Sequence, residues 1–193
     1  MPKVVDHEQY RKELLSKCFD LFAAKSYGLI TMREIAQSLN VSTGTLYHYF
    51  PSKQALFEQL IEEISQQDVR AVLAQIGNSN TLEETMNALG TYLVNNQDYC
   101  IKWTYIWVNY CQHQNIDDLQ NNNVFQRANR HYQQVVCDLL GIKDIALAAF
   151  VLSFINGLIV EKLWCNETVD FIQQCTLLGK MIKHYLQQES ENK

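Results

Sequence analysis

The sequence contains few residues that end helices. It has only 7 glycines and 2 prolines among 193 residues, and neither proline lies beyond Pro51. Glycine and proline are the strongest local breakers of regular structure, so their scarcity argues against a fold of short strands and tight turns. We therefore predict an all-α protein of about nine helices, given the helical spacing of its apolar residues.

Motifs for catalysis and metal binding are also missing. The chain has no glycine-rich phosphate loop, no H-E-x-x-H and no nucleophile elbow. Its six cysteines form no C-x-x-C pair, and we expect them to be reduced thiols that pack as small apolar groups. We therefore predict no enzymatic activity, no metal and no cofactor.

A strongly basic character is absent too, since the formal net charge is −5. Residues 1–53 hold seven Lys or Arg against five Asp or Glu, a net charge of +2, which leaves −7 for the remainder. This asymmetry would direct a polyanion toward the N-terminal part. The N-terminus lacks the apolar core of a targeting signal, so we expect a cytoplasmic protein. The apolar stretch 145–160 is too short to span a membrane and is predicted to be a buried helix.

The most informative stretch is TMREIAQSLNVSTGTLYHYFPSK, residues 31–53. Thr31 with Glu34 three residues later forms a capping box, which predicts the start of a helix. Asn40 tolerates the left-handed backbone of a sharp turn, and Ser42 can cap a second helix over residues 43–49. That short helix has few apolar groups, so its polar face suits the major groove of DNA. Together these features predict a helix-turn-helix.

The run from Ile30 to Leu56, I-T-M-R-E-I-A-x-x-L-x-V-S-x-G-T-L-Y-x-Y-F-x-S-K-x-x-L, resembles the DNA-binding signature of the TetR family of bacterial transcriptional regulators. The resemblance covers roughly residues 10 to 60. It implies an N-terminal three-helix DNA-binding domain over residues 1–53, with a fourth helix from residue 52 leading into a helical effector-binding and dimerisation domain over residues 54–193. The DNA-binding residues that it indicates are Thr31, Arg33, Thr43, Gly44, Thr45, Tyr47, His48, Tyr49 and Lys53. Packing within the domain remains an alternative role for Tyr49.

An aromatic face follows in the predicted helix 99–113. Its residues recur at helical spacing, and each buried indole or phenol needs a polar partner, so they indicate either core packing or the wall of a small-molecule cavity. Basic side chains on a later helix could orient an anionic ligand. The candidate ligand-binding residues are Tyr99, Trp103, Trp107, Tyr110, Arg127, His131 and Phe154.

The last two predicted helices, 144–164 and 168–188, are long and apolar and contain small residues. Resemblance to the TetR family implies that they pair with a second subunit in a homodimer, although their composition also suits a monomeric core. The candidate interface residues are Ala149, Ser153, Gly157, Leu178 and Ile182.

We therefore expect a dimeric regulator, acting as a repressor, that a small-molecule effector releases from a pseudo-palindromic double-stranded DNA operator. Two alternatives stay open: a regulator that responds to a partner protein or to thiol oxidation, and a helical enzyme that binds a small molecule.

Overall fold

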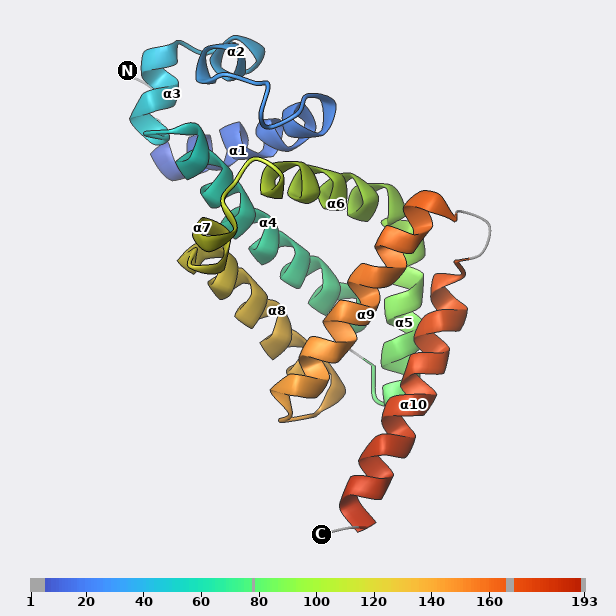
Figure 1. Cartoon of the computed structure of the whole chain (residues 1–193). Coiled ribbons are helices and arrows are strands. Elements are labelled where there is room, and N and C mark those ends of the chain that lie inside the picture. Colours follow the sequence, from blue (N-terminus) through green and yellow to red (C-terminus); the bar gives the residue numbers. More distant parts are fainter. Residues whose placement is uncertain (1–5, 78, 166–168, 192–193) are drawn as a thin grey trace. The chain divides into compact units, whose positions relative to one another are not determined.

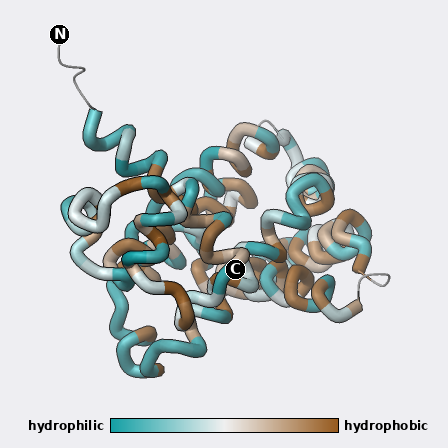
Figure 2. Tube along the Cα trace, turned by 90° about the horizontal axis from the view of Figure 1, so that it is seen from above, coloured by the Kyte–Doolittle hydropathy of each residue, from teal (hydrophilic) through white to brown (hydrophobic). Residues whose placement is uncertain are grey.

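The computed structural model describes residues 6–77, 79–165 and 169–191, and these residues form ten helices and no strand (Figure 1). Hydrophilic and hydrophobic stretches are interspersed along the Cα trace, as expected for helices that have one apolar face (Figure 2). The all-α prediction is confirmed. The helices are α1 (His7–Ala24), α2 (Met32–Ser38), α3 (Thr43–Tyr49), α4 (Lys53–Ile76), α5 (Leu82–Asn95), α6 (Gln97–Cys111), α7 (Ile116–Gln120), α8 (Asn123–Leu140), α9 (Ile145–Trp164) and α10 (Phe171–Glu191).

The helices begin at the caps that the sequence indicates. Thr31 and Glu34 form the capping box of α2, Ser42 accepts from the backbone of α3, and Thr81 caps α5. Two details differ from expectation. The short helix α7, Ile116–Gln120, lies between the two predicted elements of that region and was not among the helices named from the sequence. The predicted start of the last helix, Thr168, lies outside the described residues, and α10 begins at Phe171.

The chain divides into two compact units. The first contains Met1–Gln66 and Tyr105–Asn129, and the second contains Gln67–Thr104 and Arg130–Lys193. The predicted boundary near residue 53 differs from this division, because the second half of α6, α7 and the start of α8 belong to the first unit. Helices α4, α6 and α8 therefore each have residues in both units.

The core of the first unit joins helices α1 to α4 with the end of α6. Tyr110 of α6 is 1% exposed and stacks on Phe57 of α4, with 4.0 Å between ring centroids and 6° between planes. Tyr27, in the loop between α1 and α2, meets the Tyr110 ring edge-on at 4.7 Å. Further core residues of this unit are Leu14, Leu15, Cys18, Phe22, Ile30, Ile35, Leu46, Phe50 and Leu56.

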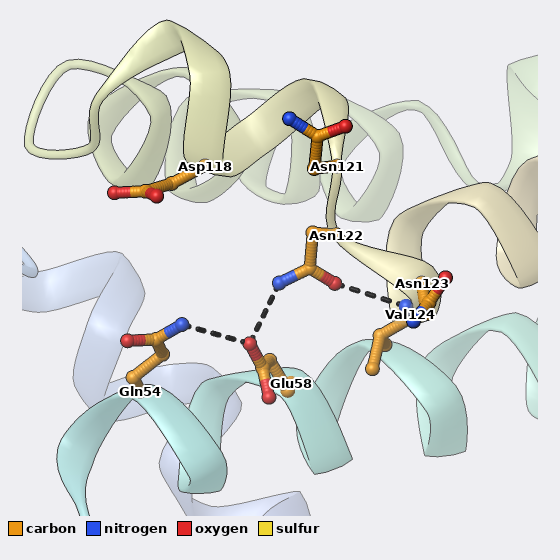
Figure 3. A pocket seen from close by; sticks show the side chains of 7 residues that line it. All are labelled: Gln54, Glu58, Asp118, Asn121, Asn122, Asn123 and Val124. Carbon is orange, nitrogen blue, oxygen red and sulfur yellow. Dashed lines mark hydrogen bonds between the residues drawn. The ribbon is translucent and has the colours of Figure 1, made fainter.

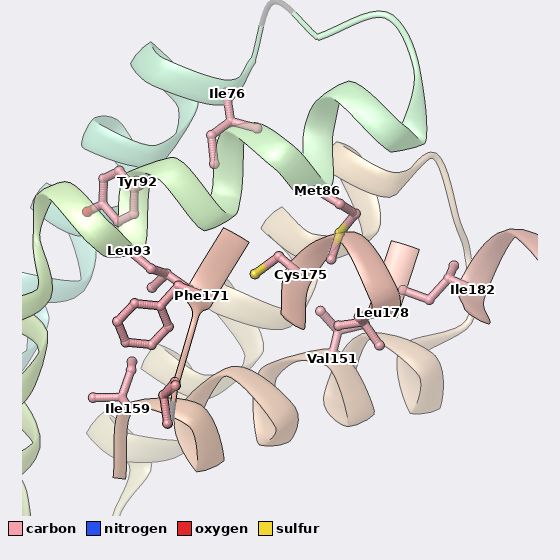
Figure 4. Packing of buried hydrophobic residues seen from close by; sticks show 11 residues of the cluster. Ile76, Met86, Tyr92, Leu93, Val151, Ile159, Phe171, Cys175, Leu178 and Ile182 are labelled. Atoms are coloured by element: carbon pink, nitrogen blue, oxygen red, sulfur yellow. The ribbon is translucent and has the colours of Figure 1, made fainter. Parts of the chain in front are cut away.

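The core of the second unit lies between α5, α9 and α10 (Figure 4). A Cβ on Gly90 of α5 would lie 2.7 Å from the Cα of Ile172, so α5 and α10 approach too closely there for any side chain. The residues of this cluster are Ile76, Met86, Tyr92, Leu93, Val151, Ile159, Val169, Phe171, Cys175, Leu178 and Ile182.

Helix α9 is less buried than we predicted. Among the described residues it is the one helix whose length and composition would allow it to cross a membrane, and 22% of its most apolar window is buried within the chain. Phe150 is 51% exposed and Trp164 is 75% exposed. The prediction of a buried helix is therefore wrong for an isolated chain, because no element within the described ranges covers one face of α9.

Candidate DNA-binding and effector sites

The turn between α2 and α3 has the geometry that a helix-turn-helix requires. The backbone N–H of Thr31 donates to Glu34 Oε2 at 2.9 Å, and the N–H of Glu34 donates to Thr31 Oγ1 at 3.3 Å. Asn40 adopts a φ of 57°, in the left-handed region predicted for it. Ser42 Oγ then accepts from the backbone N–H of Thr45 at 2.9 Å. Short-range side-chain contacts thus fix where each of the two helices starts.

Helix α3 is anchored on one side and open on the other. Leu46 and the following Phe50 are completely buried in the first unit. Tyr47, by contrast, is 52% exposed. The predicted DNA-binding residues that the structure places on exposed positions are Thr31, Arg33, Thr43, Gly44, Tyr47 and His48.

Gly44 has no packing role inside the protein. A Cβ built on it would meet only Ser42 Oγ, at 3.7 Å, which is an ordinary contact. Its backbone also lacks a positive φ, so the fold itself would accept alanine. The small residue therefore leaves open space in front of the first turn of α3.

Tyr49 and Thr45 have partners within the first unit. The Tyr49 hydroxyl lies 2.7 Å from His7 Nδ1 of α1, and its ring lies 5.6 Å from that of Tyr10. Thr45 Oγ1 lies 2.8 Å from Ser42 Oγ. Tyr49 thus holds α3 against α1, in agreement with the alternative of a packing role.

Lys53 is tied to the protein backbone. Its Nζ donates to the carbonyl oxygens of Tyr27 at 2.7 Å and Ile30 at 3.0 Å, and it lies 4.4 Å from the centre of the Tyr27 ring. Partial burial lowers the pKa of this ammonium group. Through these contacts Lys53 holds the loop between α1 and α2 in place, and its ammonium group does not project toward solvent as a phosphate ligand would.

The same loop is held by α6. Asn109 Oδ1 accepts from Ser26 Oγ at 2.9 Å and from the backbone N–H of Tyr27 at 2.8 Å. A Cβ on Gly28 would lie 2.0 Å from His113 Nε2, so the side chain of His113 occupies the space in front of this glycine. The Asn109 hydrogen bonds join residues that are 82 and 83 positions apart, so no local sequence pattern could predict them.

The predicted ligand-binding residues do not gather in one unit. Trp107, Tyr110 and Arg127 belong to the first unit, whereas the other four belong to the second. Tyr110 is a core residue, and Trp107 packs edge-on against Phe125 at 4.8 Å. Arg127 forms an ion pair with Glu62. For these three, packing and surface pairing describe the structure better than a common cavity.

In the second unit, Phe154 packs against the hydrophobic cluster and His131 is exposed. Trp103 is partly buried. Tyr99 donates from its hydroxyl to Asp68 Oδ1 at 2.7 Å, and Tyr132 donates to Asp68 Oδ2 at 2.8 Å. Asp68 was not predicted, although it occupies a position of the apolar stripe of α4, seven residues after Ile61. A carboxylate within such a stripe is the signal that could have revealed it.

A pocket of about 480 Å³ in the first unit has a polar lining (Figure 3). Glu58 accepts from Gln54 Nε2 at 3.0 Å and from Asn122 Nδ2 at 2.7 Å. Asn122 Oδ1 in turn accepts from the backbone N–H of Val124 at 2.9 Å, which caps α8. These polar groups satisfy one another, so the arrangement serves to join α8 to α4. The lining residues are Gln54, Glu58, Asp118, Asn121, Asn122, Asn123 and Val124.

The candidate dimer residues divide into two groups. On α9, Ser153 and Gly157 are exposed and Ala149 is partly exposed. On α10, Leu178 and Ile182 are 1% and 2% exposed because they pack inside the second unit (Figure 4). The prediction for these two is therefore corrected: they belong to the core, and the exposed apolar residues of α10 are Ile172, Leu177, Met181 and Tyr185.

Residues 14–60, which contain this helix-turn-helix, match the family model described as bacterial regulatory proteins, tetR family. This segment belongs to the tetR family. Nucleoid occlusion factor SlmA of Actinobacillus pleuropneumoniae is 40% identical over 60 residues, which are 31% of this chain and 30% of SlmA. The repressor KstR2 of Mycolicibacterium smegmatis is 36% identical over 53 residues, 28% of this chain and 26% of KstR2. The matched part therefore spans less than a third of these relatives.

Solved structures extend the likeness in fold beyond the tetR-family segment. A TetR transcriptional regulator from Rhodococcus sp. RHA1 matches with a TM-score of 0.61 and 20% identity, over 89% of this chain and 97% of that one. A putative transcriptional regulator from Pseudomonas aeruginosa PAO1 matches with a TM-score of 0.72 and 14% identity, over 94% and 92% of the two chains. At such identities the likeness shows the fold alone.

Proposed function

We propose that the protein is a tetR-type transcriptional repressor that binds a pseudo-palindromic operator as a dimer and releases it when a small molecule binds. The observation that carries this proposal is the open face of α3 within the tetR-family segment. There, Thr43, Gly44, Tyr47 and His48 are exposed while Leu46 anchors the helix from behind. A helix held in this way can enter the major groove without disturbing the core.

The exposure of each predicted DNA-binding side chain suggests which ones contact bases and which ones support the surface. Tyr47 and His48 are the best candidates for contacts with base edges, since their side chains have solvent in front of them. Lys53 and Tyr49 are proposed to support the binding surface from behind, since both have partners within the protein. With a net charge of only +2 in residues 1–53, affinity must come from a few placed contacts that dimerisation doubles.

The DNA-binding proposal can be tested by selecting bound fragments from a random DNA pool and measuring their affinity by fluorescence anisotropy. Tyr47→Ala should weaken binding at least tenfold. Tyr105→Ala is a matched control, because Tyr105 of α6 is 54% exposed and Tyr47 is 52% exposed. Equal affinities for the two variants would contradict the assignment of α3 as the recognition helix.

The exposed faces of α9 and α10 are proposed to form the dimer interface. Phe150 on α9 and Leu177 and Met181 on α10 are each more than half exposed, at 51%, 51% and 57%. Apolar surface of this kind is costly in water and marks an interface. The double variant Leu177→Glu, Met181→Glu should be a monomer in sedimentation velocity. The control is Lys180→Glu, His184→Glu, which places the same two carboxylates on exposed polar positions of α10 and tests whether charge alone has that effect.

A small-molecule effector is proposed to bind the second unit. Two proteins of similar fold were solved with such ligands: FadR from Bacillus subtilis with stearoyl-CoA and a putative regulator from Saccharomonospora viridis with choline. Such a ligand can release DNA only if it binds the DNA-free arrangement more tightly than the DNA-bound one. In the test, a compound that binds the protein is titrated into the protein–DNA complex, and the unchanged compound is then recovered and quantified. Release of DNA with full recovery indicates a regulator, whereas loss of the compound indicates an enzyme.

A further inference from the structure

Asp68 stands at the meeting point of three helices of the second unit. Tyr99 of α6 donates to one of its carboxylate oxygens at 2.7 Å, and Tyr132 of α8 donates to the other at 2.8 Å. Tyr92 of α5, 8% exposed, lies close enough for the Asp68 charge to help raise its pKa to about 12, although burial is the larger cause. A partly buried carboxylate thus accepts from two phenol groups and lies near a third.

This carboxylate has no countercharge. Among the described residues no lysine, arginine or histidine pairs with Asp68, and burial raises its pKa while the two hydroxyl donors oppose that rise. The phenols are hydrogen-bond donors and not countercharges: burial, together with the Asp68 charge, raises the pKa values of Tyr99 and Tyr132, so both hydroxyls keep the proton that they donate. A carboxylate that is partly removed from water is stabilised by a nearby cation, and Asp68 has two neutral donors instead.

The carboxylate also has unused capacity to accept hydrogen bonds. An ionised carboxyl group offers about four lone-pair sites, and the two tyrosines occupy two of them. If Asp68 only joined the helices, a neutral amide would do so without the cost of partly desolvating a carboxylate. A carboxylate oriented by two donors and left without a cation fits the binding of a positively charged group from outside the chain.

We propose that Asp68, oriented by Tyr99 and Tyr132, binds the positively charged nitrogen of a small organic cation, and that this cation is the effector of the regulator. The role of the cation as effector rests on the proposed function, whereas the binding site itself does not. The remaining lone pairs would accept from an ammonium N–H, and the phenol rings offer faces that attract a cation. A neutral or anionic compound of the same shape would bring no positive charge to the carboxylate.

The test uses the full-length protein and pairs of probes that differ in charge. Phenethylamine is compared with phenethyl alcohol, choline with 3,3-dimethylbutanol, and 3-phenylpropanoate serves as the anion. Binding is measured by calorimetry and by the shift in melting temperature. We expect at least one cation to bind at least tenfold more tightly than its neutral counterpart, and Asp68→Asn to remove that preference.

Two further variants make the result specific to the Asp68 charge. Asp98→Asn removes an exposed carboxylate of α6 and should leave the preference for the cation unchanged. Tyr132→Phe removes one of the two donors that orient Asp68 but keeps the carboxylate, so it should reduce the preference for the cation without abolishing it. Three results would each overturn the proposal. The first is equal binding of cation and neutral probe, and the second is no binding of either cation. The third is failure of Asp68→Asn to fold, because Asp68 would then be a structural link.

Operator affinity is measured on the same samples, so that the two proposals can fail separately. DNA binding that persists in Asp68→Asn but no longer responds to the cation supports both. A cation preference that depends on Asp68 in a protein without an operator would retain the site and reject the regulatory role. Operator binding without any preference for a cation would reject the site alone.

Discussion

Lys53 offers the sharpest test of how the helix-turn-helix is supported. The resemblance to the TetR family indicates Lys53 as a DNA-binding residue, yet its Nζ donates to the Tyr27 and Ile30 carbonyl oxygens at 2.7 and 3.0 Å. Lys53→Met keeps most of the aliphatic stem and removes both hydrogen bonds and the contact of the charge with the Tyr27 ring. If the structural role dominates, this change should destabilise the free protein before any DNA is added.

The expected loss can be estimated from these contacts. A hydrogen bond to a charged group contributes roughly 1.5–3 kcal/mol when it is well buried, and Lys53 is only partly buried. We therefore take the lower part of the range for the pair, a loss of about 2 kcal/mol in the free energy of unfolding. For a chain of 150–250 residues, that corresponds to roughly 4–8 °C in melting temperature.

Urea unfolding of wild-type protein and Lys53→Met, followed by circular dichroism, measures this loss. Lys17→Met is the control, because Lys17 is an exposed lysine of α1 and its replacement should change stability by less than about 0.5 kcal/mol. If Lys53→Met unfolds at the wild-type urea concentration while its operator affinity falls tenfold or more, Lys53 is a phosphate ligand and the reasoning from the carbonyl contacts is refuted.

Three further predictions concern single positions. Gly44→Ala should raise stability by about 0.4–1 kcal/mol, since the position tolerates a Cβ, but should weaken operator binding; a loss of stability in urea would contradict this. Gly90→Ala should lower the melting temperature by several degrees, because its Cβ would lie 2.7 Å from the Ile172 backbone, while Gly157→Ala, which meets nothing within 4 Å, should not. The raised pKa of Asp68 means that the folded state binds protons more tightly than the unfolded state. Stability should therefore fall as pH rises from the unfolded pKa through the raised value, so the melting temperature of Asp68→Asn relative to wild type should increase over that range. A difference that does not change with pH would contradict the raised pKa.

The sequence was most informative where the deciding contacts are local. The capping box of Thr31 and Glu34 and the cap at Ser42 act over three residues, so the helix starts could be predicted from spacing alone. The left-handed conformation of Asn40 is also a local property, since few other side chains tolerate it. The exposed face of α3 followed from the same local pattern.

The sequence was least informative where contacts join distant segments. The carbonyl partners of Lys53 lie 23 and 26 residues away, so its position suggested a contact with DNA instead. The aromatic spacing of α6 located a buried face correctly, but it could not show that Tyr110 packs with Phe57 while Tyr99 bonds to Asp68. Periodicity defines the face of a helix and does not identify the neighbour that the face meets.

The contribution of α6 to the first unit has a practical consequence for protein engineering. The Tyr110 ring covers Phe57 and Tyr27, and Asn109 holds the loop that precedes α2. A fragment cut at residue 60 or 66 would keep the whole recognition motif but would expose that aromatic surface and free the loop. A chimeric regulator that exchanges only the matched segment 14–60 would pack the N-terminal helices of one protein against the α6 of another. A working exchange must therefore carry residues 105–129 along with the N-terminal helices.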